Sequence, residues 1–532
     1  MQITLKRIWQ DKTVIKIQII IALLVLTIFT FTACGNESDN IPSNVENVQD
    51  SQNNVPDTSP ITNALIPGSE DALGADVTIT TIIPSQVFII NTFAEGLARV
   101  LVGESWDTAE WGFIDETGQV VIPPQFDWAR DFTDGLAAVA HGSWDTGIFW
   151  GYIDRYGEMI IPQYFDDVLE FSEGLAAVQI GGLWGYVDKS WDAVETQREI
   201  TDRFVVNPQQ FVIYPQFYNA GSFQRGLAPV MTIEWIESID YEGVGHFTPF
   251  YRWGFIDTSG NPVIPIQYNA VTSFMSNGLA GVMVGEWVEG NDFTEEINPR
   301  WGLVDTTGRE VVPPQFLALD IFACDYLIPV SIGDNWNSAL WGAVDATGNM
   351  IIQPQFNSIG QFIDGVAIVR VDDGDSSLFG AIDRTGREIM PLQYEWISTF
   401  SYGVTTARYE GSLRLVDIAG NMIADLDYDE SWIVSEGFVA VRVGDWETGL
   451  WGLIDTTGRE IISPQFNTIW SFSEGFAVVG AEKADNQWGF GLVDTNGQIV
   501  LPLQYNGIYQ LGNGLFGILE GEHWSIVRID FN

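Results

Sequence analysis

Residues 111–140 have the sequence WGFIDETGQVVIPPQFDWARDFTDGLAAVA, and variants of this segment recur along most of the chain. Each copy begins with Trp-Gly, continues through Asp-x-x-Gly and Ile-x-Pro-x-Gln-Phe, and ends with Gly-Leu-Ala. Copies begin at Trp111, Trp150, Trp184, Trp253, Trp301, Trp341 and Trp451, with weaker ones at Phe379, Leu413 and Phe490. A pattern of this length that persists over hundreds of residues indicates a tandem repeat array.

The first part of each copy predicts a β-hairpin. Trp111–Asp115 has a β-branched residue at its fourth position, as nearly every copy does, and this favours a strand. Asp115 and Gly118 predict a tight turn, because Asp can accept backbone hydrogen bonds there and Gly can adopt a left-handed conformation. Gln119–Ile122 is then the returning strand. We expect Pro123–Pro124 to end the pairing, since proline has no N–H to donate.

The second part of each copy supplies further strands. Leu136–Ala140 predicts a third strand, and a fourth is possible around Phe126–Phe132. Side chains of residues 111–114 would point alternately to two faces that are both apolar, so each sheet must be covered on both sides. Gly112 is expected to leave room for a neighbouring side chain. The predicted fold is therefore all-β, with tandem three- to four-stranded antiparallel meanders stacked face to face in a β-propeller-like or open superhelical array.

This combination of motifs resembles the bacterial WG-repeat family. The resemblance covers roughly residues 85–532 and includes the Trp-Gly-x-Ile/Val-Asp-x-x-Gly, Ile-x-Pro-x-Gln-Phe/Tyr and Gly-Leu-Ala segments. It implies a repeat module of bacterial surface and cytoplasmic proteins that has no common catalytic activity.

The N-terminus predicts export and lipidation. A basic start is followed by an apolar run over residues 17–31, about 15 residues, which is short of the ~20 that span a bilayer as a helix. The segment Phe31-Thr32-Ala33-Cys34-Gly35 resembles a bacterial lipobox. Residues 1–33 are thus predicted to be a lipoprotein signal peptide, and lipidated Cys34 to hold the protein on the extracytoplasmic face of the cell membrane. The alternatives are an uncleaved N-terminal helix or a non-lipid signal.

The remainder of the chain divides into a tether and the array. Residues 34–77 are rich in Asn, Ser, Asp and Pro and nearly lack aromatic residues, which predicts a disordered tether. Residues 78–532 form the predicted WG-repeat array, with about ten units and a half-unit at each end. Insertions are expected at residues 191–208 and 235–247.

Composition excludes several classes of function. The 532 residues include 23 Lys and Arg against 71 Asp and Glu, a formal net charge of −48, which repels nucleic acid. Two Cys and three His residues form no disulfide framework and no metal-ligand spacing, so neither a metal site nor a cofactor is predicted. Asp372–Asp375 is interpreted as an acidic hairpin loop rather than a Ca²⁺ site, and Cys324 as a buried small residue rather than a nucleophile.

Tryptophans outside the repeat positions are the candidate ligand-binding residues. The periodic tryptophans are interpreted as core, whereas the others lie in loops beside acidic residues, where an exposed ring suits a sugar or a cation. These candidates are Trp106, Trp144, Trp235, Trp287, Trp336 and Trp446.

Together these observations predict a binding protein. No nucleophile elbow, phosphate-binding loop or HExxH segment is present, and we expect no enzymatic activity. The predicted function is that of a non-catalytic, lipid-anchored extracytoplasmic module that binds a protein partner, with the acidic field favouring a basic one. The alternative is an envelope carbohydrate-binding protein that uses the loop tryptophans.

Overall fold

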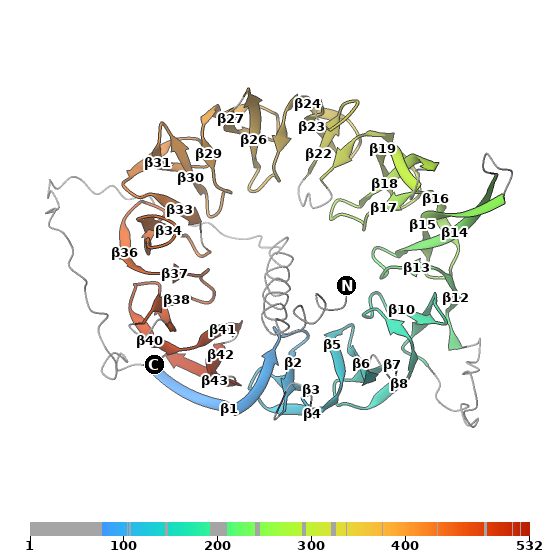
Figure 1. The fold of residues 1–532 in the computed structure, drawn as a ribbon, viewed down its shortest axis with the longest axis horizontal. Coiled ribbons are helices and arrows are strands. Elements are labelled where there is room, and N and C mark those ends of the chain that lie inside the picture. The colour runs from blue at the N-terminus through green and yellow to red at the C-terminus, as the bar shows by residue number, and fades with distance from the viewer. Residues whose placement is uncertain are drawn as a thin grey trace, which may run out of the picture. The chain divides into compact units, whose positions relative to one another are not determined.

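The computed structural model describes residues 77–532, apart from residues 104, 106–107, 144–146, 192–209, 240–244, 290–293, 321–325, 337, 375, 434, 484–486, 513, 522 and 532. The predicted signal peptide, Cys34 and nearly all of the predicted tether therefore lie outside the described residues. Regular elements of the described part are all β-strands (Figure 1), and none of it forms a helix long and apolar enough to cross a membrane.

The all-β prediction is confirmed. Nine four-stranded antiparallel sheets and one seven-stranded sheet are present in the described residues. The seven-stranded sheet, of order β4-β3-β2-β1-β43-β42-β41, contains β1 (Val77–Ile90), β2 (Leu97–Val102), β3 (Glu110–Asp115), β4 (Val120–Phe126), β41 (Gly507–Gly512), β42 (Leu515–Glu520) and β43 (His523–Phe531).

The four-stranded sheets follow one another along the chain, each built from four consecutive strands. In chain order they are β5 (Trp128–Thr133), β6 (Leu136–Ser143), β7 (Gly147–Asp154) and β8 (Met159–Phe165); β9 (Asp167–Val168), β10 (Leu175–Ile180), β11 (Leu183–Asp188) and β12 (Ile213–Phe217); β13 (Asn219–Ala220), β14 (Leu227–Ile239), β15 (Gly245–Asp257) and β16 (Pro262–Tyr268); β17 (Ala270–Val271), β18 (Leu279–Glu289), β19 (Thr294–Asp305) and β20 (Glu310–Phe316); β21 (Ala318–Leu319), β22 (Leu327–Ile332), β23 (Leu340–Asp345) and β24 (Met350–Phe356); β25 (Ser358–Ile359), β26 (Val366–Asp373), β27 (Ser376–Asp383) and β28 (Glu388–Tyr394); β29 (Trp396–Ile397), β30 (Val404–Tyr409), β31 (Ser412–Asp417) and β32 (Met422–Leu426); β33 (Glu430–Ile433), β34 (Phe438–Val443), β35 (Leu450–Asp455) and β36 (Glu460–Phe466); β37 (Thr468–Ile469), β38 (Phe476–Glu482), β39 (Trp488–Asp494) and β40 (Ile499–Tyr505).

The boundaries of the sequence repeat do not coincide with the boundaries of the sheets. One sheet begins with the first strand β5, continues with the Gly-Leu-Ala strand β6 and the Trp-Gly strand β7, and ends with the fourth strand β8. The predicted fourth strand around Phe126–Phe132 is thus present as β5. However, the two halves of the copy in residues 111–140 belong to two sheets, since β3 and β4 lie in one and β5 and β6 in the next.

The sheets stack face to face, as predicted. Tyr152 and Ile161 of one sheet share a buried cluster with Val178 and Val187 of the next, so the core lies between sheets. Both faces of the Trp-Gly strand are buried. Phe113 packs in the apolar cluster on one face of the sheet, and Ile114 packs in the cluster on the other face. The periodic tryptophans also pack on these cores: Trp184 and Trp451 are buried, and Trp111, Trp150, Trp301 and Trp341 are partly buried.

Glycine follows tryptophan because the backbone of the fourth strand passes directly over it. Trp111 pairs with Phe126, but Phe113 pairs with Ile122, so three residues of β4 stand opposite Gly112. A Cβ atom on Gly112 would lie 2.6 Å from the Ile122 carbonyl oxygen. Two predictions are therefore wrong: the prolines form this bulge within β4 instead of ending its pairing, and the glycine accommodates backbone instead of a neighbouring side chain.

One copy tests this explanation within the same chain. Its Trp-Gly pair is replaced by Leu413-Arg414, and its fourth strand β32 lacks the Pro-x-Gln segment. Arg414 pairs directly with Asp425, without the bulge that the other copies have at this point. This copy thus lacks both the glycine and the proline bulge. That is expected if the glycine is needed to accommodate the bulge.

The first and last strands of the array are joined by hydrogen bonds. β1 pairs with β2 through residues 87–90 and with β43 from Val77 to Val87, so strands far apart in the sequence lie side by side (Figure 1). An Arg528 Nη2–H group of β43 donates to the Glu116 carbonyl oxygen, 2.6 Å away, beside β3. The predicted half-units at the two ends therefore complete one sheet.

Candidate binding surface

Side-chain hydrogen bonds align the turns of neighbouring sheets. In five places an acidic residue in the turn between the first and second strands accepts a hydrogen bond from a backbone N–H in the corresponding turn of the next sheet. The acceptor–donor pairs are Glu95–Gly135, Asp134–Gly174, Glu173–Gly226, Glu436–Gly475 and Glu474–Gly514. Since the strands are antiparallel, loops between second and third strands leave from the opposite ends. We call this opposite side the loop face and the side of the aligned turns the turn face.

A second set of hydrogen bonds fixes the hairpins of the loop face. The residue after the aromatic at or just beyond the end of the fourth strand accepts a hydrogen bond from a backbone N–H 15 or 16 residues further on, in or just beyond the second strand. These caps are Asp127, Asp166, Asn269, Asn357, Glu395, Asp429, Asn467 and Asn506. The hairpin loops are thus attached to the sheets by a recurring contact that sequence analysis missed.

Four of the six predicted tryptophans lie in equivalent hairpins between second and third strands: Trp235, Trp287, Trp336 and Trp446. Trp235, Trp336 and Trp446 have 56%, 65% and 80% of their surface exposed. Trp287 lies in β18, paired through its backbone with Glu296, and Trp106 and Trp144 lie outside the described residues. The predicted insertion at 235–247 forms the outer part of the long β14–β15 hairpin, whereas most of the one at 191–208 is not described.

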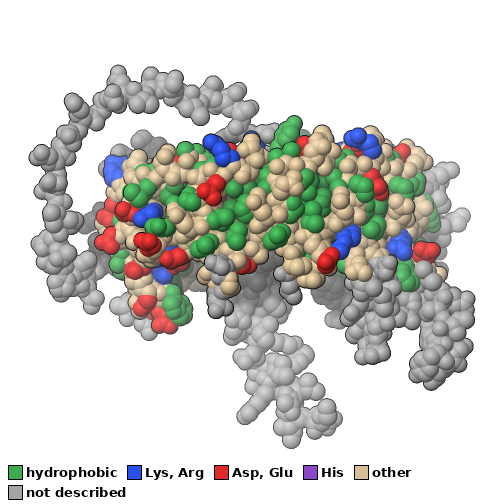
Figure 2. Space-filling model, turned by 90° about the horizontal axis from the view of Figure 1, so that it is seen from above, with side chains coloured by type: hydrophobic (Ala, Val, Ile, Leu, Met, Phe, Trp, Pro, Cys, Tyr) green, Lys and Arg blue, Asp and Glu red, His purple; other side chains and the backbone are tan. Residues whose placement is uncertain are grey.

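Further exposed tryptophans on this face were not predicted. They are Trp128, Trp396, Trp432, Trp470 and Trp488, exposed by 37–46%. Four of them lie one to three residues after the capping Asp, Glu or Asn, so aligning the copies on that residue would have found them. Figure 2 shows hydrophobic side chains reaching the surface of the sheets, with acidic and basic side chains among them.

Aromatic contacts group several of these tryptophans in two consecutive sheets. The Trp432 ring stacks on Trp451 with centroids 4.4 Å apart and planes inclined by 21°. In the next sheet, Trp470 and Trp488 both contact Phe490, at 5.9 and 6.0 Å. One buried cluster contains both Trp451 and Ile469, the residue before Trp470, so the two groups adjoin.

An arginine connects this region to the most exposed tryptophan. The Arg442 guanidinium lies 5.5 Å from the centroid of the Trp451 ring and pairs with the Glu430 carboxylate. Its Nη1 donates a hydrogen bond to the Asp445 carbonyl oxygen, 2.7 Å away, in the loop that carries Trp446. Backbone N–H groups of that loop and the Thr448 hydroxyl bond to the Asp445 carboxylate and lower its pKa. The loop is therefore fixed while Trp446 projects from it.

Aspartates on the turn face have a structural role, as predicted. The Asp115 carboxylate accepts hydrogen bonds from the Thr117 hydroxyl and from two backbone N–H groups, and the Thr117 bond is the main cause of its lowered pKa. Burial would raise the pKa of Asp305 and Asp383, but hydrogen bonds from a threonine and an arginine at each site outweigh it and lower the pKa to about 2. Gly118 has φ = 83°, the left-handed conformation that this turn requires.

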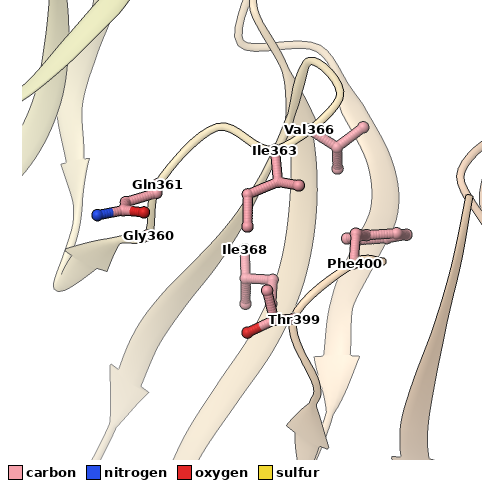
Figure 3. Close-up of a pocket in the computed structure, with 7 residues that line it drawn as sticks. All are labelled: Gly360, Gln361, Ile363, Val366, Ile368, Thr399 and Phe400. Atoms are coloured by element: carbon pink, nitrogen blue, oxygen red, sulfur yellow. The ribbon is translucent and has the colours of Figure 1, made fainter. Parts of the chain in front are cut away.

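A small apolar cleft lies between two sheets (Figure 3). Its volume is about 220 Å³, and Gly360, Gln361, Ile363, Val366, Ile368, Thr399 and Phe400 line it. None of these side chains is an acid or a base, and the Thr399 hydroxyl is the one reactive group among them.

The other candidate sites from the sequence are the acidic segment at Asp372 and the cysteine at position 324. Asp372 forms an ion pair with Arg370 at 3.3 Å and accepts a hydrogen bond from Ser377 in the β26–β27 hairpin, while Asp375 is not among the described residues. In the described part of the chain, no three His, Cys, Asp or Glu side chains are placed to hold a metal ion. Cys324 falls in the gap at residues 321–325.

Stacked antiparallel sheets with repeated hairpin loops define an all-β repeat protein. The family model described as "WG containing repeat" matches ten segments, which together cover more than half of the chain: residues 111–143, 150–184, 209–232, 253–286, 301–336, 341–374, 379–411, 415–445, 451–480 and 490–524. The chain belongs to the WG-repeat family. No curated protein matches it.

Several solved structures are similar to parts of the fold. The tricorn protease is 10% identical, with a TM-score of 0.22 over 82% of this chain and 46% of that chain. Dipeptidyl peptidase 4 of Porphyromonas gingivalis is 9% identical, with a TM-score of 0.32 over 82% and 65%. Prolyl oligopeptidase B from Galerina marginata is 8% identical, with a TM-score of 0.27 over 79% and 55%. The chain spans less than two thirds of the length of each.

Proposed function

We propose that this WG-repeat protein is a non-catalytic interaction module whose loop face binds a partner protein. The observation that carries the proposal is the exposure of Trp235, Trp336 and Trp446 on equivalent hairpins of three separate sheets. Tryptophan is among the residues that contribute most to binding energy at protein interfaces. Because these hairpins belong to different sheets, they offer a broad surface and not a single pocket.

Charge supports a basic partner. The net charge of −48 produces a negative field that attracts cationic proteins and accelerates their association. We further propose that the array works on the extracytoplasmic face of a cell membrane, anchored through lipidated Cys34, since the sequence of residues 1–34 favours export and lipidation.

The test is a binding assay with the full chain in detergent. Bait protein is incubated with an envelope protein extract and with purified cell-wall polysaccharide, each at low and high salt. We expect the bait to retain a basic protein at low salt and to lose it at high salt, because screening weakens charge attraction. The variant W235A/W336A/W446A should lose that protein at both salt concentrations.

The matched control removes equally exposed aromatic rings from the turn face. Tyr156 and Tyr402 are 76% and 61% exposed, and both lie in turns on that side. The variant Y156A/Y402A should retain the partner. Loss of the partner in the control, or retention in the tryptophan variant, contradicts the proposal. Binding to polysaccharide that survives high salt and needs the three tryptophans would favour carbohydrate recognition instead.

A further inference from the structure

Three residues occupy one equivalent position in different sheets. Arg130, Trp432 and Trp470 each directly follow a first-strand residue that pairs with a valine of the second strand. The same position carries an arginine in one sheet and an exposed tryptophan in two others. The arginine therefore shows which group fits beside the repeat aromatic at this place.

Arg130 is held between an aromatic ring and two carboxylates. Its guanidinium carbon lies 5.0 Å from the centroid of the Trp150 ring. Its nitrogens pair with Asp167 at 3.2 Å and with Glu170 at 3.4 Å, both on the next sheet. Arg99 stacks similarly over Trp111 at 5.2 Å and pairs with Asp131 at 2.7 Å. A guanidinium bound by an indole face and a carboxylate is thus a recurring arrangement within this fold.

In two consecutive sheets no arginine fills this position. Trp432 and Trp470 stand there instead, and 44% and 46% of their surfaces are exposed. Trp488 and Trp446 extend the same surface, exposed by 45% and 80%. We call these four residues the aromatic patch. Trp432 contacts Trp451, and Trp470 and Trp488 contact Phe490, so three of the four rings are held against aromatic residues of the repeat. Trp446 projects from the loop that the Asp445 carboxylate fixes.

The surroundings of the patch are strongly acidic. Residues 425–447 contain one base, Arg442, and seven acids, of which Glu436 lies on the turn face and the other six are Asp425, Asp427, Asp429, Glu430, Asp445 and Glu447. Arg442 is already engaged by Glu430 and by the Asp445 carbonyl oxygen. Asp427 and Glu447 are exposed. Indole faces beside this excess of carboxylates are complementary to planar cations.

We propose that the aromatic patch binds an arginine-rich segment of a partner protein. Guanidinium groups of that segment stack on Trp432 and Trp470 and pair with neighbouring carboxylates, as Arg130 does within the chain. Arginine fits better than lysine, since its planar group is less strongly hydrated, stacks on rings and pairs with carboxylates through two nitrogens. The inference rests on the proposed function, because the patch is one part of the loop face.

The test compares two peptides of equal charge. Full chain in detergent is titrated with octa-arginine and with octa-lysine at physiological salt, and binding is followed by calorimetry and tryptophan fluorescence. We expect octa-arginine to bind several-fold more tightly. In the variant W432L/W470L, octa-arginine affinity should fall about 10-fold and the preference over octa-lysine should disappear, as expected for two lost cation–π contacts. The control Y156A/Y402A, which removes exposed rings from the turn face, should bind both peptides as the parent chain does.

A second variant tests the carboxylates without touching the core. Exchanging the exposed acids, in D427N/E447Q, should weaken octa-arginine binding several-fold at low salt. Equal affinities of the two peptides for the parent chain, or unchanged octa-arginine binding in both patch variants, would overturn the proposal. The two proposals fail separately. Equal affinities of the two peptides for the parent chain, together with partner capture that needs Trp235 and Trp336, remove only the inference. Preferential octa-arginine binding that needs Trp432 and Trp470, without any partner capture, removes only the proposed function.

Discussion

Single aspartates determine the turns that the repeat needs. Asp305 and Asp383 each accept hydrogen bonds from a threonine hydroxyl, two backbone N–H groups and an arginine. The Asp-x-x-Gly spacing was sufficient to predict this role, because all the partners lie within four residues. In contrast, the capping residues such as Asp127 act across 15 residues, and no local pattern identifies their partners.

Because the turn aspartates have lowered pKa values, we expect the folded chain to lose stability in acid. The pKa of Asp305 and of Asp383 is about 2 in the folded chain against a usual value of 3.8, so the unfolded chain binds more protons between these values. Their contribution is complete above about pH 4 and is lost as the pH falls through 2. Urea unfolding measured at pH 5, 4, 3 and 2 should give a free energy of unfolding that decreases as the pH is lowered. The slope should be smaller in Asp383→Asn. In Thr385→Val the loss should be smaller and should end at a higher pH, because the folded pKa of Asp383 moves toward 3.8. Parallel curves contradict this assignment.

At the scale of the strand pair, the Trp-Gly strand and its bulged partner form one element. A Cβ atom on Gly302 would lie 2.6 Å from the Val312 carbonyl oxygen and 2.7 Å from the Pro314 nitrogen. The strands themselves could be predicted from sequence alternation and β-branched residues. The bulge could not, because proline usually ends pairing and its accommodation depends on a glycine in the neighbouring strand.

The glycine prediction follows from this clash. Gly302→Ala should lower the free energy of unfolding by about 1–3 kcal/mol, the usual cost of overpacking a core, as measured by urea titration. The matched control is Arg414→Ala, at the equivalent position of the copy without the bulge. It should cost at most about 1 kcal/mol, since it removes a partly exposed ion pair with Asp425. Equal losses in the two variants would show that the bulge does not require glycine.

For the molecule as a whole, the repeat array and a half-unit at each end could be predicted from the sequence. The pairing of the first strand with the last strand in one sheet could not. Residues 77–90 and 523–531 pair across most of the chain, and nothing local to either segment specifies the other. The binding surface was likewise found in part. Trp446 was recognisable because it lies outside the repeat pattern, whereas Trp432 and Trp470 became candidates only when the sheets showed that they share a position with Arg130.

The anchor proposed at Cys34 determines where this array works, and it can be tested directly. Cys34→Ala should move the protein from the membrane to the soluble extracytoplasmic fraction or leave it as an unprocessed precursor that carries no lipid label, because only the cysteine thiol accepts the lipid. Fractionation with metabolic fatty-acid labelling measures both. Cys324→Ala is the matched control, and it should stay membrane-bound and labelled. If Cys34→Ala remains in the membrane at the size of the parent chain and the parent also lacks label, the apolar run at residues 17–31 is an uncleaved anchor instead.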